Sequence, residues 1–318
     1  MTTTVVRPAR KVLADCVRAA TAAPSLHNSQ PWRFRIDGPA IDVFAEPGRR
    51  LQVIDPLGRE QLMSVGAAVF TLRLAIRQAG YRTESALFPE PGVPDLVARV
   101  VVSHPAAANP AVEALYAAIP HRHTNRWPFA QTAVPADALE HLADAARREG
   151  ATLAVAGPTA RNAILGLAQE AERRLHELPG YRAELARWTG DAVRYDGVPA
   201  QVAGPWDALE SMPVRDFGAT LPRRTASFEP YPTLLTLATH GDRPADWVRA
   251  GQALQRALLT ATWLDLATTP ISQPVEIPAV REVLAGPYAQ LVLRVGYGRR
   301  APGSSPRRPV SDVLDPAH

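Results

Sequence analysis

The sequence has very little cysteine and lysine, because among its 318 residues it contains only Cys16 and Lys11 of these types. A lone thiol cannot close an internal disulfide, which is typical of a reducing compartment, so we expect a cytoplasmic protein. No apolar run approaches the roughly 20 residues that cross a membrane as a helix. Met1–Lys11 also lacks the apolar centre of a secretory signal. We therefore expect no membrane partner.

A concentration of positive charge is also missing. The formal net charge is only +4, and the arginines are spread among acidic residues without a basic stripe that carries aromatics. His121 and His123 stand two apart with no suitable third ligand nearby, which is a poor zinc pattern. The chain has no Gly-x-Ser-x-Gly elbow, no Gly-x-Gly-x-x-Gly turn and no P-loop. We expect no nucleic-acid partner, no metal, and none of the sites that these motifs build.

Hydrophobic periodicity predicts an α+β fold. Apolar residues recur at helical spacing over 9–22, 59–78, 135–149 and 246–267. Short apolar runs bounded by turn residues predict strands over 32–36, 41–45, 96–103, 151–156 and 291–295. We expect antiparallel-rich sheets with helices packed against them.

The second half of the chain repeats the order of the first. Leu291–Val295 (LVLRV) is almost identical to Leu96–Val100 (LVARV). In the preceding predicted helices, Gly251-x-Ala253 matches Gly66-x-Ala68. This order of helix and strand indicates an internal duplication, with halves at 1–115 and 116–318. A chance similarity stays an alternative, because Leu, Val, Ala and Arg are common in this chain.

Residues 188–232 interrupt the second half with a proline-rich stretch that is too long for an ordinary connection. Trp206, Phe217, Phe228 and Tyr231 give this stretch apolar side chains with which to pack. We expect an ordered lid over a site. A disordered insertion is the alternative.

The segment Ala23–Trp32, with the sequence APSLHNSQPW, predicts a rigid polar loop between a helix and a strand. Its prolines stop the helix and fix φ, and short polar side chains such as Ser25 and Asn28 hold tight turns. Rigid polar loops on a scaffold often carry binding sites. A plain helix-to-strand turn would use the same residue types.

Residues 121–129 read HRHTNRWPF. Arg122, Thr124 and Arg126 alternate, so in an extended segment they point to the same side. Two guanidiniums that flank a hydroxyl can grip a dianion such as a phosphate. The alternative is a solvated, charged linker.

Both segments are similar to signatures of the flavin-dependent nitroreductase family. The pattern APSxxNxQPW resembles the loop that lies along the FMN ring, and RxTxRxxF resembles the segment that holds the FMN phosphate and the O2/N1 edge. In ordinary members the arginine motif comes first, and a homodimer builds the site from both subunits. Here the order is reversed, which resembles the Acg-type subfamily with two fused halves. The resemblance implies an internally duplicated nitroreductase-like fold that acts as a monomeric pseudo-dimer, and a homo-oligomer stays open.

The resemblance also implies FMN as the cofactor and suggests which residues contact it. These are Pro24, Ser25, Leu26, Asn28, Arg122, Thr124, Arg126, Ile271, Ser272, Gln273, Arg307 and Arg308. Arg126 is expected at the N1/O2 edge, and a backbone N–H of Ile271–Gln273 at N5. We expect no catalytic side chain, because the flavin itself carries the hydride.

On this basis we expect an NAD(P)H-dependent FMN oxidoreductase that reduces a small aromatic or quinone-type acceptor. One alternative is a protein that stores FMN under its lid without turnover. A further alternative is a specialised FMN-dependent dehydrogenase of a metabolite.

Overall fold

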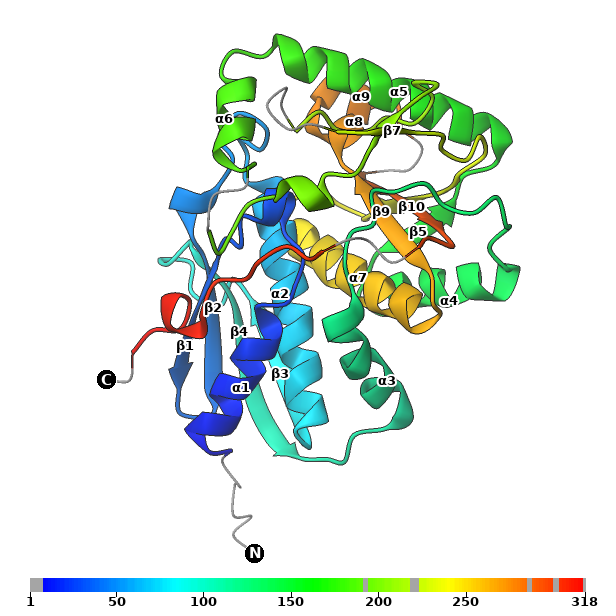
Figure 1. Ribbon diagram of the computed structural model, residues 1–318. Coiled ribbons are helices and arrows are strands. Elements are labelled where there is room, and N and C mark those ends of the chain that lie inside the picture. Colours follow the sequence, from blue (N-terminus) through cyan, green and yellow to red (C-terminus); the bar gives the residue numbers. More distant parts are fainter. Residues whose placement is uncertain (1–7, 191–193, 218–222, 285–287, 300–302, 317–318) are drawn as a thin grey trace, which may run out of the picture.

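The computed structural model describes residues 8–190, 194–217, 223–284, 288–299 and 303–316. Its helices are α1 (Arg10–Ala20), α2 (Arg59–Gln78), α3 (Pro110–Ala118), α4 (Ala136–Arg147), α5 (Pro158–Glu177), α6 (Tyr181–Arg187), α7 (Pro244–Trp263), α8 (Gln273–Glu276) and α9 (Pro278–Arg281). Its strands are β1 (Trp32–Asp37), β2 (Ala40–Ala45), β3 (Tyr81–Leu87), β4 (Leu96–Pro105), β5 (Thr152–Val155), β6 (Trp206–Asp207), β7 (Thr225–Ala226), β8 (Thr233–Ala238), β9 (Ala267–Ile271) and β10 (Ala289–Gly296). Figure 1 shows α2 and α7 side by side near the centre of the molecule.

The two four-stranded sheets have the same topology. The first has the order β1-β2-β4-β3 and the second has the order β5-β8-β10-β9, with antiparallel neighbours throughout. In each half a helix, α1 or α4, precedes the first strand, and a long helix, α2 or α7, follows the second strand. The predicted α+β fold and its internal duplication are therefore confirmed, whereas the boundary between residues 115 and 116 stays a prediction.

The long helices α2 and α7 cross at a pair of equivalent glycines. Gly66 of α2 lies against the carbonyl of Val248, and Gly251 of α7 lies against the carbonyl of Met63. Each contacted carbonyl comes three residues before the glycine of its own helix, so the crossing is symmetric about a two-fold axis. A Cβ atom at either glycine would overlap the facing carbonyl oxygen. The crossing thus requires residues without a side chain.

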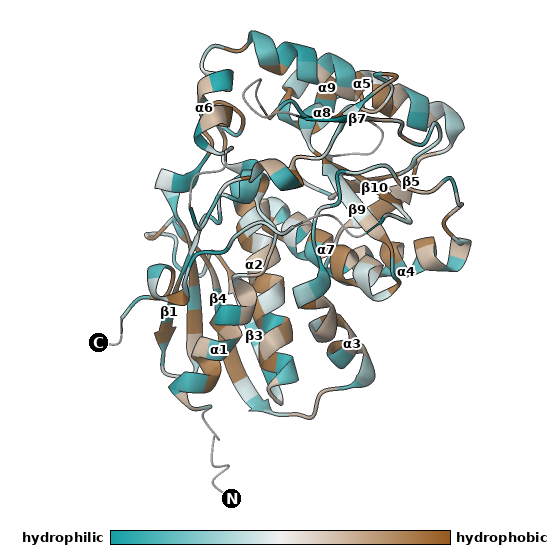
Figure 2. Ribbon diagram, viewed as in Figure 1, coloured by the Kyte–Doolittle hydropathy of each residue, from teal (hydrophilic) through white to brown (hydrophobic). Residues whose placement is uncertain are grey.

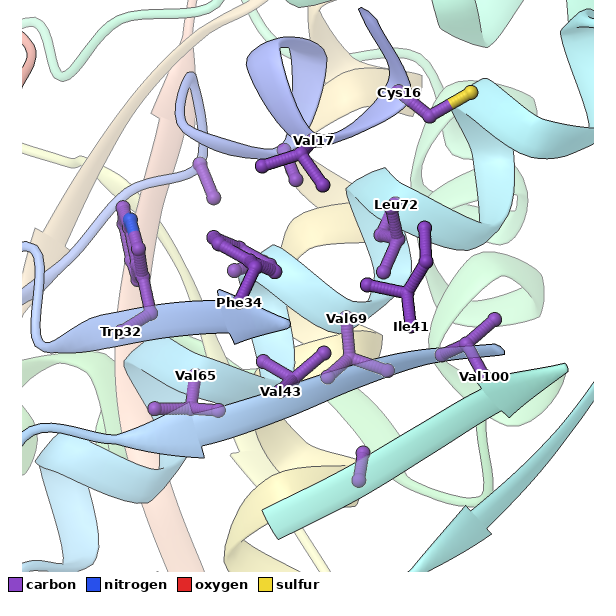
Figure 3. Close-up of a cluster of buried hydrophobic side chains, with 14 of the residues drawn as sticks. Cys16, Val17, Trp32, Phe34, Ile41, Val43, Val65, Val69, Leu72 and Val100 are labelled. Carbon is purple, nitrogen blue, oxygen red and sulfur yellow. The ribbon is translucent and has the colours of Figure 1, made fainter. Parts of the chain in front are cut away.

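The first half packs its sheet against α1 and α2. Figure 3 shows Trp32 and Phe34 of β1 in one cluster with Val17 of α1 and Leu72 of α2, and all four are fully buried. Cys16 belongs to the same cluster, and burial raises the pKa of its thiol to about 12. Cys16 therefore packs as a small apolar residue.

Residues 156–232, between β5 and β8, have no counterpart in the first half, where only a tight turn joins β1 to β2. This segment begins with α5, which is largely hydrophilic in Figure 2, and α6. Within the predicted lid over 188–232, residues 191–193 and 218–222 lie outside the described residues. Phe217 and Phe228 are buried, whereas Tyr231 is 73% exposed. Its ring instead lies under the guanidinium of Arg161.

The helix predicted over 246–267 ends earlier than expected. Helix α7 stops at Trp263, and Asp265 adopts a φ of 55° before β9 begins at Ala267. A residue in the left-handed region ends a helix, although Asp is a less common choice there than Gly or Asn. The apolar residues at 264 and 266 continued the helical pattern past the true end.

The C-terminal segment returns to the first half of the chain. Phe34 donates its N–H to the carbonyl of Val313 at 2.6 Å, and Asp315 donates to the carbonyl of Phe34 at 2.8 Å. Closer to the centre, Asn28 Nδ2 donates to the carbonyl of Pro306 at 3.0 Å. These bonds place Arg307 beside the loop that joins α1 to β1.

Candidate functional site

The loop between α1 and β1, residues 21–31, holds three non-glycine residues in the left-handed region. His27, Asn28 and Gln30 have φ values of 48°, 54° and 48°. Ser25 Oγ accepts the N–H of Gln30 at 2.9 Å, and Asn28 Nδ2 donates to the carbonyl of Gly197 at 3.0 Å. Each such conformation costs on the order of 1–3 kcal/mol, and strain of this kind concentrates at binding sites. The geometry therefore favours a functional loop over a plain turn.

Two adjoining cavities open beside this loop. The larger encloses about 1050 Å³ and is mainly apolar, and the smaller encloses about 560 Å³ and is mainly polar. Pro24, Ser25, Thr124 and Arg126 line both cavities, so the cavities meet between the loop and the arginine segment. This pair of cavities matches a ligand with a flat apolar part and a charged tail.

The smaller cavity is suited to an anion. Arg122, Arg126 and Arg307 line it, and in the described part of the chain none of them pairs with a carboxylate. Burial and the neighbouring Arg307 lower the pKa of Arg122 to about 9, and burial lowers the pKa of Arg307 to about 10. Burial, Arg215 and Arg223 lower the pKa of Arg126 to about 10. Because a guanidinium stays charged at neutral pH, these shifts indicate charges that a bound anion would stabilise.

Other deeply buried arginines are paired. Arg215 and Arg294 are about as buried as Arg122 or more so. Their ion pairs are Arg215–Glu276 at 2.5 Å and Arg294–Glu229 at 2.6 Å. By contrast, the Nε atoms of Arg122 and Arg307 are buried without a hydrogen-bond partner among the described residues. The unbalanced charge is therefore a local property of the smaller cavity.

The larger cavity is lined by elements from both halves. Its lining includes Leu26 and His27 of the loop, Glu60, Met63, Ser64 and Ala67 of α2, Thr269–Gln273 after α7, and Met212–Arg215 and Phe217 of the predicted lid. The α2 residues recur every three or four positions and so share one face of that helix. Apolar and aromatic surface predominates, which suits a planar aromatic group.

The predicted contact residues all line one or both cavities, with one exception. Arg308 instead donates to the Glu46 carboxylate at 2.7 Å and to the carbonyl of Gln30 at 3.2 Å. Arg307, its neighbour, lines the smaller cavity and donates to Asn28 Oδ1 at 2.9 Å. Adjacent residues of an extended segment point to opposite sides, so only one of the two arginines can face the cavity.

Comparison with known proteins shows similarity to one family along most of the chain. The family model described as "Nitroreductase family" matches residues 119–299, which is more than half of the sequence. The chain belongs to the nitroreductase family. It is 32% identical to "Putative NAD(P)H nitroreductase Rv3131" of Mycobacterium tuberculosis, over 97% of this chain and 92% of that protein. It is 31% identical to "Putative NAD(P)H nitroreductase acg" of the same organism, over 95% of each chain.

Solved structures of the nitroreductase family show a more distant similarity. A nitroreductase with bound FMN from Bacteroides fragilis is 14% identical, with a TM-score of 0.37, over 66% of this chain and 100% of that chain. A nitroreductase with bound FMN from Desulfitobacterium hafniense is 13% identical, with a TM-score of 0.40, over 64% of this chain and 98% of that chain. Among the residues that the structure describes, no helix is both long and apolar enough to span a bilayer.

Sequence reasoning missed two polar residues of this nitroreductase-family cavity, His27 and Glu60. Both ring nitrogens of His27 are buried without a partner among the described residues. The ring packs edge-on against Phe217, with 5.7 Å between the two ring centroids. Burial, then the charges of Arg215 and Arg126, lower the pKa of His27 well below its usual value. Glu60 lies in the first turn of α2, where an acidic residue is common because of the helix dipole, so its position gave no signal.

Proposed function

We propose that this nitroreductase-family protein binds one FMN per chain and uses it to pass hydride from NAD(P)H to a small aromatic or quinone-type acceptor. The observation that carries the proposal is a set of three arginines beside an apolar cavity, Arg122 buried and Arg126 and Arg307 half-buried, with no carboxylate partner among the described residues. A phosphate dianion would balance the positive charge of the smaller cavity, and a flat ring system attached to it would suit the apolar larger cavity. The family names of the relatives support the oxidoreductase part of the proposal.

In this proposal Arg122 and Arg307 hold the phosphate, and the Thr124 hydroxyl adds a donor between them. Hydrogen bonds to charged groups contribute about 1.5–3 kcal/mol each, so three such residues suffice for tight binding. Arg126 lines both cavities, which suits a contact with the N1/O2 edge of the ring. A cation at that edge favours electron uptake by the ring.

The larger cavity would hold the ring. Pro24–Leu26 would pack on one face, and the backbone of Ile271–Gln273 would offer an N–H to N5. When bound, FMN supplies two-electron hydride exchange, which no side chain provides. The protein's own residues would orient the ring and exclude water, with Met212 and Phe217 of the 188–232 segment acting as a lid.

The duplicated fold contains a second, equivalent position, and two of the helix residues at that position have larger side chains. When the helices are aligned on the crossing glycines, Ser64 of the cavity corresponds to Arg249, and Ala67 corresponds to Gln252. Arg73 donates to Gln252 Oε1 at 2.6 Å, and it pairs with the Glu149 carboxylate at 2.8 Å. Binding of a flat ring there would disturb these hydrogen-bonded groups, which supports one FMN per chain.

The loops beside the two positions differ in length, and this difference also favours a single site. Residues 148–151 join α4 to β5, whereas residues 21–31 join α1 to β1. The short turn cannot supply a wall comparable with Pro24–Asn28. We therefore propose a pseudo-dimer, divided near residue 115, with one site built from both halves and no need for a second subunit.

FMN storage without turnover is a second candidate, and the anchoring of the proposed lid favours it. Arg215 donates to the Glu276 carboxylate at 2.5 Å, to Ser272 Oγ at 3.0 Å and to the Tyr181 hydroxyl at 3.2 Å. These bonds tie the segment to the cavity wall in a buried setting. A lid held in this way would keep NAD(P)H away from the ring.

Anaerobic mixing of the FMN-loaded protein with excess NADPH separates the two candidates. We expect loss of the flavin absorbance band within seconds. Absence of bleaching over an hour would favour storage. In that case the flavin of the double variant Arg215→Met/Glu276→Met should bleach faster than that of wild type, because the bonds that tie the lid to the cavity wall are lost. Both partners are replaced together so that no unpaired buried charge remains. A protein that takes up no FMN would contradict both candidates.

A further inference from the structure

Glu60 is a buried carboxyl in the wall of the larger cavity, and the proposed function gives it no role. Its side chain is 6% exposed, and its Oε2 atom has no hydrogen-bond partner among the described residues. It lies on the same face of α2 as Met63, Ser64 and Ala67, which line that cavity. Buried polar atoms without a partner are rare, and each one requires an explanation.

Burial and the neighbouring carboxylates favour the neutral form of Glu60, against the opposing charges of Arg59 and Arg215. Arg59 lies 3.3 Å from Oε1, but its guanidinium also donates to two backbone carbonyls of other elements. Asp55 and Glu276 add negative charge, and Glu276 already pairs with Arg215. Burial and the charge of Glu276 raise the pKa of Glu60 well above its usual value. The carboxyl therefore keeps its proton at pH values at which an exposed glutamate is ionised.

The position of Glu60 matches a step that the reduction of an acceptor requires. Glu60 and Ser272 both line the larger cavity, and Ser272 belongs to the segment that the proposed function puts at N5. The acid therefore lies in the wall of the cavity in which the hydride would be transferred. Two-electron reduction of a quinone to a hydroquinone needs one hydride and one proton.

We propose that Glu60 is the proton donor for this reduction, an inference that rests on the proposed function. The hydride, supplied through FMN by NAD(P)H, gives the quinone two electrons and one hydrogen, so that one oxygen becomes anionic. The O–H bond of Glu60 breaks, and a new O–H bond forms on that oxygen. The Glu60 carboxylate then regains a proton from water, which balances the cycle.

His27 is the other candidate donor in the cavity. Its imidazole is neutral, because burial and two nearby arginines lower its pKa. A neutral imidazole is a much weaker acid than a carboxylic acid, so it is the poorer donor at neutral pH.

The test compares two oxidants with photoreduced, FMN-loaded protein under anaerobic conditions. 1,4-Benzoquinone requires a proton, and ferricyanide takes electrons alone. We expect Glu60→Gln to slow reoxidation by benzoquinone roughly 100-fold, the scale of general acid catalysis, while reoxidation by ferricyanide changes less than about twofold. The control Glu113→Gln, which changes an exposed first-turn glutamate of α3, should match wild type with both oxidants.

Two outcomes would overturn the role of Glu60 while leaving the proposed function intact: an unchanged benzoquinone rate, or equal slowing with both oxidants. Two other results would overturn the proposed function and this inference together: the wild-type protein binds no FMN, or NADPH does not bleach the bound flavin.

A measurement independent of turnover covers the case in which Glu60→Gln fails to fold. Carbon-13 NMR of the glutamate carboxyls in wild-type protein should show one group that still carries its proton at neutral pH. In that protein the benzoquinone rate should also fall as pH rises through the pKa of this group, and the ferricyanide rate should not. Ordinary titration of every glutamate would overturn the proposal.

Discussion

Arg122 carries a buried charge that has no carboxylate partner among the described residues, so replacing it should affect stability and FMN binding in opposite directions. For Arg122→Met we expect the free energy of unfolding of the FMN-free protein to rise by about 1–2 kcal/mol, because an unpaired buried cation is removed. FMN affinity should fall roughly 10- to 100-fold, because a charge-assisted bond to the phosphate is lost. Denaturant unfolding and flavin fluorescence titration measure the two quantities.

Arg308 is the matched control, since it is a neighbouring arginine that pairs with Glu46 outside both cavities. Arg308→Met should lower stability and change FMN affinity less than about threefold. Wild-type FMN affinity in Arg122→Met, or equal losses in the two variants, would refute the phosphate assignment.

Glu60 should make the stability of the FMN-free protein depend on pH. Its pKa is raised in the folded state, so the folded protein holds a proton that the unfolded chain loses above about pH 4.3. The contribution of Glu60 to the free energy of unfolding is therefore greatest at low pH. It falls by up to about 1.4 kcal/mol per pH unit until the pKa of the folded state is reached. Between pH 5 and 7, Glu60→Gln should gain stability relative to wild type as pH rises. A constant difference across this range would show that Glu60 ionises normally.

At the level of residues, local spacing could predict Arg122, Thr124 and Arg126, because alternation in an extended segment brings all three to one cavity. It could not predict Glu60, since its importance comes from Glu276 and Arg215, which are far away in the sequence. Nor could it choose between Arg307 and Arg308, because that choice depends on which side of the C-terminal segment faces Asn28.

At the level of elements, the crossing of α2 and α7 should be intolerant of any side chain at its two glycines. Gly66→Ala and Gly251→Ala would each put a Cβ atom into a facing carbonyl, so we expect each to destabilise the protein by about 3 kcal/mol. Gly166→Ala is the control, because a Cβ at this exposed position of α5 would meet nothing within 4 Å. It should raise stability by up to about 1 kcal/mol. Similar melting temperatures for all three variants would contradict the crossing geometry.

Elements with regular apolar spacing could be predicted from sequence, and the helix over 59–78 coincides with α2. Strand β3 is among those that the sequence pattern does not predict, because its residues are exposed or half-buried and carry little apolar pattern. The helices α5 and α6 belong to the insertion and have no counterpart in the first half to indicate them. The helix predicted over 246–267 was too long, because Asp265 adopts a left-handed conformation that the apolar pattern of its neighbours does not reveal.

At the level of the whole molecule, the reversed order of the two motifs follows from the duplication. The loop of residues 21–31 comes from the first half, and the arginine segment precedes α4 of the second half, yet both line the same cavities. An ordinary two-subunit site would place them on different chains. In the proposed arrangement the hydrogen-bonded side chains of Arg73, Glu149 and Gln252 occupy the equivalent second position, so we expect one site.

The number of FMN molecules bound per chain can be measured by titrating the FMN-free protein with FMN and following the quenching of the flavin fluorescence. We predict saturation at one FMN per chain in wild type, and a large loss of affinity when Arg122 and Arg126 are both replaced by alanine. Saturation at two FMN per chain would contradict the filled second position. Absence of quenching, or full affinity in the double variant, would contradict the assignment of these cavities to FMN.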